Sequence, residues 1–229
     1  MIGKDFQEIL KRFNEEKKSD LGGNHFASTM RHEFSDDLRN VVAEFVDLSL
    51  YEVKISPGQA NNWAEIPWAG IRNTNATENF MTGFYIVYLF KSDGKGVYLT
   101  LNQGVTKIIG KKQHNNKKEE LKYRALKLRE SANYSEGFSE NEIDIGTDSG
   151  EYEAGNIISK YYSFEDLDNE EIIHEDLDAI LQTYMDLIPV YNQLFLEKVN
   201  NLNVWQIYPG TQDVKERLWH LFKNEGYLG

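Results

Sequence analysis

The clearest pattern along the chain is a run at 84–90 (FYIVYLF) in which every position is apolar or aromatic. Alternate positions of an extended chain point to opposite faces, so this strand has two hydrophobic faces and is expected at the centre of a sheet. The segment 92–96 (SDGKG) supplies turn residues, and 97–101 has the character of a returning strand. The pattern predicts a central hairpin as the core of the fold.

Helical spacing marks four other segments of the chain. Apolar residues recur at intervals of three and four over 4–17, 34–45 and 117–132, which predicts amphipathic helices there. A longer stripe over 176–199 predicts a helix that Pro189 should kink or split in two.

The remaining segments of the first 200 residues predict shorter elements. Strands are expected at about 50–56 and at 143–145, whereas 152–162 (YEAGNIISKYY) is equally compatible with a strand and a short helix. The Pro-Gly step after the first of these strands should open a loop that runs over 57–83 to the central hairpin. An acidic connector is expected at 165–171.

These elements together predict an α+β fold. Its sheet is expected to be mixed or mostly antiparallel, built on the central hairpin and flanked by several helices. We expect one domain over 1–200, followed at 201–229 by a cap or the truncated start of a further module. Within that last part, 204–229 predicts a short strand, a Pro-Gly turn and a helix that carries Leu218, Trp219 and Phe222.

Composition sets the class of protein. The chain has 229 residues, of which 40% are hydrophobic and 13% aromatic, enough for the core of one large domain. It has no cysteine, which excludes disulfides and thiolate metal sites. No apolar run reaches the roughly 18 residues that a membrane span needs, and the first ten residues are charged, unlike a secretion signal. We therefore expect a cytoplasmic protein that does not contact membranes.

The net charge of −12 is unevenly distributed. Lys and Arg exceed Asp and Glu by seven between 107 and 129, whereas fifteen carboxylates face a single lysine between 136 and 178. One segment is thus suited to contact phosphate, while the other is suited to face water or a basic partner.

Motifs for catalysis and nucleotide binding are weak or missing. The five histidines are dispersed without an HExxH pair, and no GxSxG elbow occurs. A phosphate-binding loop is not formed either, because Gly104 lies one residue too far from Gly110 and Lys112 stands where Ser or Thr is required. The acidic stretch at 136–178 either includes a divalent-cation site or forms a solvated face.

Aromatic residues around the predicted loop offer a different chemistry. Four aromatic residues either belong to the core of a β-rich centre or form a slot in which a nucleobase stacks: Trp63, Trp68, Tyr85 and Tyr88. In the second interpretation, the amides of Asn61 and Asn62 donate to the edge of the base or to phosphate. Composition alone does not choose between the two.

The blocks WAEIPW, GFYIVYLF and GVYLTLNQG, with YEAGNIISKYY further on, resemble the N-terminal domain of McrB-type proteins over about residues 1–200. That family belongs to the modified-cytosine-dependent (type IV) restriction systems of phage defence. The resemblance implies a recognition domain that is not itself an enzyme and that flips 5-methylcytosine out of duplex DNA. It implies no cofactor in this chain, and GTP and Mg²⁺ on a linked AAA+ module. The expected partners are a McrC-type nuclease or a linked HNH nuclease domain.

The resemblance also assigns residues one by one. Trp68 corresponds to the tryptophan expected to form one wall of the base pocket, Tyr85 and Leu89 to positions opposite it, and Tyr152 to a further wall. The strand pattern independently places Tyr85 and Leu89 on one face.

Contacts to the duplex are expected outside the pocket. Ala60 falls where some relatives place an aromatic wedge, so this wedge is either missing or supplied by Trp63 or another loop residue. The residues expected to contact DNA are Asn61, Asn62, Trp63, Lys107, Lys111 and Lys112.

Two alternatives from other classes stay open. Glu52 and Lys54 form the Glu-x-Lys pattern of a metal-dependent nuclease on a predicted strand, although ordinary alternation on a half-buried strand gives the same pattern. The acidic stretch 136–178 would instead suit a protein-interaction module that docks a basic partner.

Overall fold

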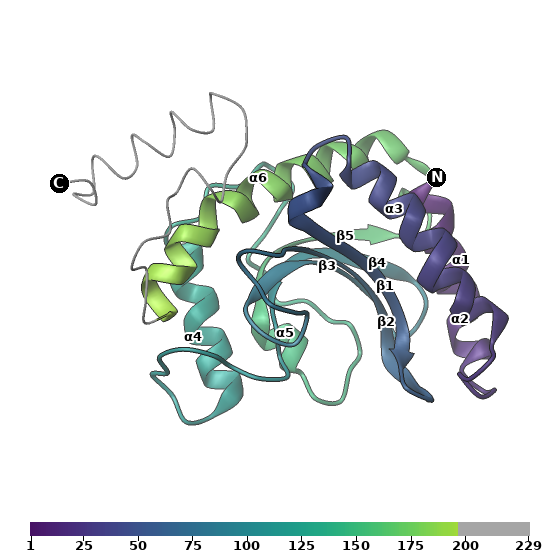
Figure 1. The fold of residues 1–229 in the computed structure, drawn as a ribbon, viewed down its shortest axis with the longest axis horizontal. Helices are drawn as coiled ribbons and strands as arrows, with labels where there is room; N and C mark the ends of the chain where they lie inside the picture. Colours follow the sequence, from purple (N-terminus) through teal and green to yellow (C-terminus); the bar gives the residue numbers. More distant parts are fainter. Residues whose placement is uncertain (197–229) are drawn as a thin grey trace.

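A computed structural model describes residues 1–196, which form an α+β fold around a five-stranded sheet (Figure 1). Each strand is antiparallel to its neighbours, in the order β1-β2-β3-β4-β5. The expected central hairpin is confirmed, since β3 is the middle strand and pairs with β4 along its whole length. The strands are β1 Tyr51–Gln59, β2 Asn62–Asn73, β3 Phe84–Phe90, β4 Gly96–Gln103 and β5 Asn156–Ser163.

One face of the sheet, here called the helix face, carries Phe84, Ile86, Tyr88 and Phe90 of β3. Helix α1 (Ile2–Glu16) places the Phe6 ring 4.7 Å from the Tyr88 ring and 5.2 Å from the Phe90 ring. Helix α6 (Glu170–Phe195) covers the Phe84 end of the same strand. Helices therefore bury the apolar residues on this face of β3.

The other face, here called the loop face, carries Tyr85, Val87 and Leu89. It is covered largely by irregular segments, 74–83 and 131–150 (Figure 1). The second of these pairs with the outer edge of β5 through Ser139 and Ser159, then passes the β3–β4 turn, where the Ile145 carbonyl accepts from the Ser92 amide at 2.9 Å. Burial of Phe138, Ile143 and Ile145 holds it against the sheet.

The expected loop over 57–83 is wrong in its larger part, because residues Asn62–Asn73 form β2. The Pro-Gly step at 57–58 indicated a loop, but β1 continues through it. Pro67 lies beside the irregularity in β1 and before the first residue that pairs with β3, so its missing N–H removes no ladder hydrogen bond. Burial of Ile66, Ala69 and Ile71 then supplies the strand with its core contacts. Only 74–83 stays irregular.

The helices agree with the sequence in position, with shifted ends. The expected helices at 4–17, 34–45 and 117–132 are confirmed, the second in a shortened form that follows a short helix and a π turn. These elements are α1, α2 His25–Thr29, a π turn at Met30–Phe34, α3 Ser35–Val42 and α4 Lys117–Arg129.

Helix α6 begins at Glu170, so part of the expected acidic connector is helical. Pro189 does not split the helix, which continues to Phe195 and curves along its length in Figure 1. The expected end at 199 and the elements expected at 204–229 lie outside the described residues, as does the proposed boundary near 200.

Two further expectations are settled by the backbone. The expected strand at 143–145 is wrong, because its isoleucines are buried without strand pairing. The ambiguous 152–162 contains both elements, a short helix α5 (Glu151–Gly155) followed directly by β5. None of the helices within residues 1–196 has the length and apolar character of a membrane span.

Candidate nucleic-acid interface

The loop face gathers the residues expected to form the base pocket. Trp68 of β2 lies directly opposite Leu89 of β3, so the two side chains share a face. Tyr85 lies four residues before Leu89 on the same side of β3. Leu89 is fully buried and Tyr85 nearly so, whereas Trp68 is half-buried.

A ring that the sequence patterns did not single out lies between these walls. The Phe80 ring centroid, from the segment 74–83, is 5.2 Å from that of Trp68 and 5.1 Å from that of Tyr85. We call Trp68, Phe80 and Tyr85 the aromatic cluster. Both distances to the Phe80 ring lie within the range at which aromatic rings attract each other.

Gly70 forms the floor beneath the aromatic cluster. It lies opposite Val87 in β3, and a Cβ at this position would stand 2.5 Å from the Phe80 ring and 3.1 Å from the Trp68 ring. The first distance is too short for a side chain and the second is tight, so the hydrogen of glycine lets the Phe80 ring approach the sheet. An isolated glycine inside a β-rich run is the signal that could have revealed this close approach.

Tyr85 and Tyr152 bring hydroxyl groups to the same region. The Tyr85 hydroxyl donates to the Phe80 carbonyl at 2.6 Å, and the Asn102 side chain donates to the Tyr152 carbonyl at 3.0 Å. Burial raises the pKa of Tyr85, with the nearby Tyr152 as a further cause, and burial also raises the pKa of Tyr152. Both phenols are therefore neutral hydrogen-bond donors around pH 7.

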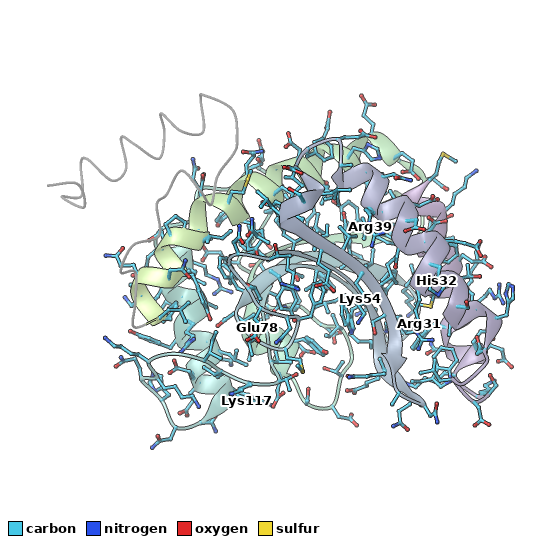
Figure 2. All side chains as sticks on the ribbon, in the orientation of Figure 1. Arg31, His32, Arg39, Lys54, Glu78 and Lys117 are labelled. Atoms are coloured by element: carbon cyan, nitrogen blue, oxygen red, sulfur yellow. The ribbon has the colours of Figure 1, made fainter. Side chains whose placement is uncertain are left out.

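Two cations border the aromatic cluster. Lys54 of β1 lies opposite Gly70 and is exposed, with its ammonium 6.0 Å from the Trp68 ring centroid. The Arg72 guanidinium lies 5.6 Å from the Phe80 ring and binds the Glu52 carboxylate. Figure 2 shows Lys54 over the middle of the sheet, with Glu78 displaced toward α4.

The basic segment 107–116 begins beside the segment 74–83 that carries Phe80. The Lys107 amide donates to the Met81 carbonyl at 3.1 Å, so the backbone of this lysine lies against the segment 74–83. The Lys111 amide instead donates to the Phe195 carbonyl at the end of α6. The structure therefore brings Lys107 to the aromatic cluster but places Lys111 and Lys112 farther along, and all three side chains are exposed.

A buried ion pair fixes the backbone of this segment. The Glu120 carboxylate binds Arg124 Nε at 2.7 Å and accepts from the amides of Gln113 at 2.8 Å and His114 at 2.9 Å. Arg124 also donates to the Lys111 carbonyl at 2.6 Å. Burial alone would raise the pKa of Glu120, but the hydrogen bonds from Arg124 and the two amides lower it overall, so the carboxylate stays ionised.

Comparison with protein families decides the class of this domain. The model of the MrcB-like N-terminal domain family matches residues 8–189, which include all five strands and the aromatic cluster. The chain belongs to this family. It is accordingly a domain of the restriction-system class, as the sequence resemblance implied. No curated protein and no solved structure matches the chain.

The β1–β2 turn forms the exposed tip of this MrcB-like domain. Ala60 has a positive φ of 54°, and Asn61 and Asn62 beside it are exposed. Their exposed side-chain amides carry donors and an acceptor that are suited to contact a ligand. Their expected role in DNA binding stays a prediction.

Trp63 takes a different position from Trp68. Its indole N–H donates to the Ser19 carbonyl at 2.7 Å, and its ring lies 5.4 Å from that of Phe13 on α1. The MrcB-like domain therefore holds its two β2 tryptophans on opposite faces, with Trp63 packed under α1 on the helix face. Its role as a wedge or DNA contact stays a prediction.

The residues of the nuclease alternative also lie on the loop face of the MrcB-like domain. Glu52 accepts from Arg72 Nε at 2.8 Å, and Lys54 is the exposed cation beside Trp68. No group of three or more side chains placed to hold a metal ion occurs within residues 1–196.

Proposed function

We propose that this domain binds duplex DNA containing modified cytosine and accommodates the extruded base against the loop face. The observation that carries the proposal is the gathering of Trp68, Tyr85 and Leu89 on one face of the sheet, with Tyr152 near Tyr85. Flat aromatic side chains with polar groups at their edges are suited to stacking a base.

The energetics of such binding are balanced. Extrusion of a base costs a few kcal/mol, and stacking on an aromatic wall returns about 1–3 kcal/mol per base. A 5-methyl group adds about 1 kcal/mol at most through its apolar surface. The shape of the slot must therefore contribute to discrimination, and the neutral Tyr152 hydroxyl is suited to donate to the base.

Phosphate contacts belong to the rim of the slot. The exposed Lys54 lies beside Trp68, the backbone of Lys107 is bonded to Met81 next to Phe80, and Lys111 and Lys112 extend the basic surface toward α6. Asn61 and Asn62 would reach the duplex from the β1–β2 tip. Because lysine contacts release counterions from DNA, affinity should fall steeply with salt.

Cutting is assigned to other modules. A linked AAA+ module that uses GTP and Mg²⁺, with a McrC-type nuclease, or a linked HNH nuclease would act on the DNA that this domain selects. The purified chain should then leave methylated DNA intact in the presence of Mg²⁺ or Mn²⁺. Cleavage that is lost in Glu52→Gln would establish the nuclease alternative instead.

The test of recognition is a binding titration with matched duplexes. Wild-type protein should prefer a duplex with one modified cytosine, and Trp68→Ala should remove that preference while the thermal unfolding transition stays cooperative. Tyr161→Ala is the matched control, because Tyr161 is an exposed aromatic on β5, at the far edge of the sheet from β1. Equal binding of modified and plain duplexes by the wild type would refute the proposal.

A titration panel of cytosine duplexes extends the test to the kind of modification. It should compare 5-methyl, 5-hydroxymethyl, N4-methyl and bulkier groups in one sequence context. The preferred group would report the shape of the slot, which must carry most of the discrimination.

A further inference from the structure

Phe80 occupies the space that the proposed function reserves for a base. Its ring is tilted by 50° against Trp68 and meets Tyr85 edge-on at 86°. The Arg72 guanidinium covers it at 5.6 Å. These are the surfaces that a stacked pyrimidine would use, so a base and the Phe80 ring cannot share the space above Gly70.

We propose that Phe80 is an internal occupant of the base slot, which an incoming modified cytosine displaces. This inference rests on the proposed function and adds to it a residue that sets the threshold for base entry. The ring imitates a base in size and in its contacts, and it keeps the apolar floor at Gly70 dry when no DNA is bound.

The anchoring of the loop allows the ring to leave without unfolding the segment. Thr77 Oγ1 donates to the Phe84 carbonyl at 3.0 Å, and the Gly104 amide donates to the Gly83 carbonyl at 2.9 Å, so both ends of the loop are fixed. Between them, Phe80 is half-exposed and its carbonyl is held by Tyr85. A rotamer change of one side chain toward solvent is therefore sufficient, and this occurs rapidly in partly exposed residues.

Every extruded base binds more weakly because the contacts of the Phe80 ring must first be lost. A modified cytosine compensates for this loss through its extra contacts, whereas plain cytosine stays stacked in the duplex and binds only through phosphate contacts. Removing the ring should thus tighten binding of the modified duplex and permit extrusion of the plain base as well. Two aromatic contacts correspond to about a tenfold change in Kd.

The experiment compares wild type, Phe80→Ala and Phe80→Leu on duplexes with and without one 5-methylcytosine. Kd is measured by titration, and 2-aminopurine beside the target reports extrusion. Phe80→Ala should bind the modified duplex about tenfold more tightly than wild type and extrude plain cytosine too. Phe80→Leu, which keeps an apolar side chain without a ring, should lie between and covers the case in which the alanine variant does not fold. Met81→Ala is the matched control, since Met81 is exposed in the same loop.

Each other outcome has a definite meaning. Weaker binding by both Phe80 variants would make the ring a wall of the slot and overturn the proposal. Unchanged binding and extrusion would make it a packing residue only, which also overturns the proposal.

A second arm without DNA separates this inference from the proposed function. 5-Methylcytidine should raise the melting temperature of Phe80→Ala more than that of wild type, because only the variant has the space above Gly70 open before binding. If wild type shows no preference for modified duplex, the proposed function fails whatever this arm shows. If wild type has the preference but the variant binds neither nucleoside nor duplex more tightly, only the role of Phe80 fails.

Discussion

The two faces of one sheet differ in what covers them. The helix face is packed by α1 and α6 through rings such as Phe6 and Tyr184, and β3 residues there are sealed from solvent. The loop face is covered by short irregular segments, has a glycine floor at Gly70 and carries an exposed lysine at its rim. The same strand thus serves stability on one side and offers an adaptable surface on the other, because loops rearrange at lower cost than packed helices.

The largest effect is expected from removing a packed ring on the helix face. Phe84 is stacked on Tyr191 at 4.7 Å and meets Tyr184 edge-on at 5.0 Å, with 1% of its surface exposed. Phe84→Ala should lower the free energy of unfolding by about 3–5 kcal/mol, measured by urea denaturation. The protein that stays folded should keep its preference for modified duplex. A variant of unchanged stability that has lost the preference would contradict the division between the faces.

A smaller effect is expected from filling the floor of the loop face. In Gly70→Ala the new methyl group meets the Phe80 and Trp68 rings, so overpacking should cost about 1–3 kcal/mol of stability. Binding of the modified duplex should weaken about tenfold, because the base loses its floor.

The double variant Gly70→Ala/Phe80→Ala sharpens this result. It should recover part of the lost stability, because the two positions are in direct contact and their effects are not additive. Wild-type affinity of Gly70→Ala for the modified duplex would show that the base lies elsewhere.

The smallest effect concerns charge on the helix side. Burial, and then the charge of Asp37, raises the pKa of Asp5 to about 7, with Glu170 adding to this and the Met1 amine opposing it. Asp5 Oδ2 is buried without a hydrogen-bond partner in the described part of the chain. A carboxyl group with a raised pKa stabilises the fold fully below about pH 4, its ordinary value, and this contribution is lost as the pH rises through 7.

Asp5→Asn should therefore be more stable than wild type at pH 8 and equal to it near pH 4. Solvent screening of this half-exposed group limits the gain to about 1 kcal/mol, a shift of roughly 2–4 °C in Tm. Thermal unfolding at the two pH values measures it. A gain of the same size at both would mean that the amide acts through packing and not through charge.

The sequence predicts those parts of the fold that depend on local patterns of apolar and turn residues. The β3–β4 hairpin follows from continuous apolar character and a turn, and Tyr85 and Leu89 share a face because alternation requires it. The pattern does not predict strand β2, because the Pro-Gly step at 57–58 indicates a loop, and only the irregular pairing of β1 between Ser56 and Gly58 shows how the sheet accommodates this step.

The aromatic cluster depends on longer-range geometry. The aromatic pattern made Trp68 and Tyr85 candidates and family resemblance added Tyr152, whereas neither indicated Phe80 or Gly70. Their contact depends on the register of β2 against β3 and on the path of 74–83, which no periodicity encodes. The same holds for Trp63, whose face is set by the pairing of the whole strand.

The buried pair of Glu120 and Arg124 determines how the basic segment meets a ligand. Its hydrogen bonds order the backbone at Lys111, Gln113 and His114 before any DNA arrives. On association only the lysine side chains lose freedom, so the entropic cost of binding is lower than for an unstructured basic tail. Two charges that no ligand touches would thereby raise affinity through preorganisation.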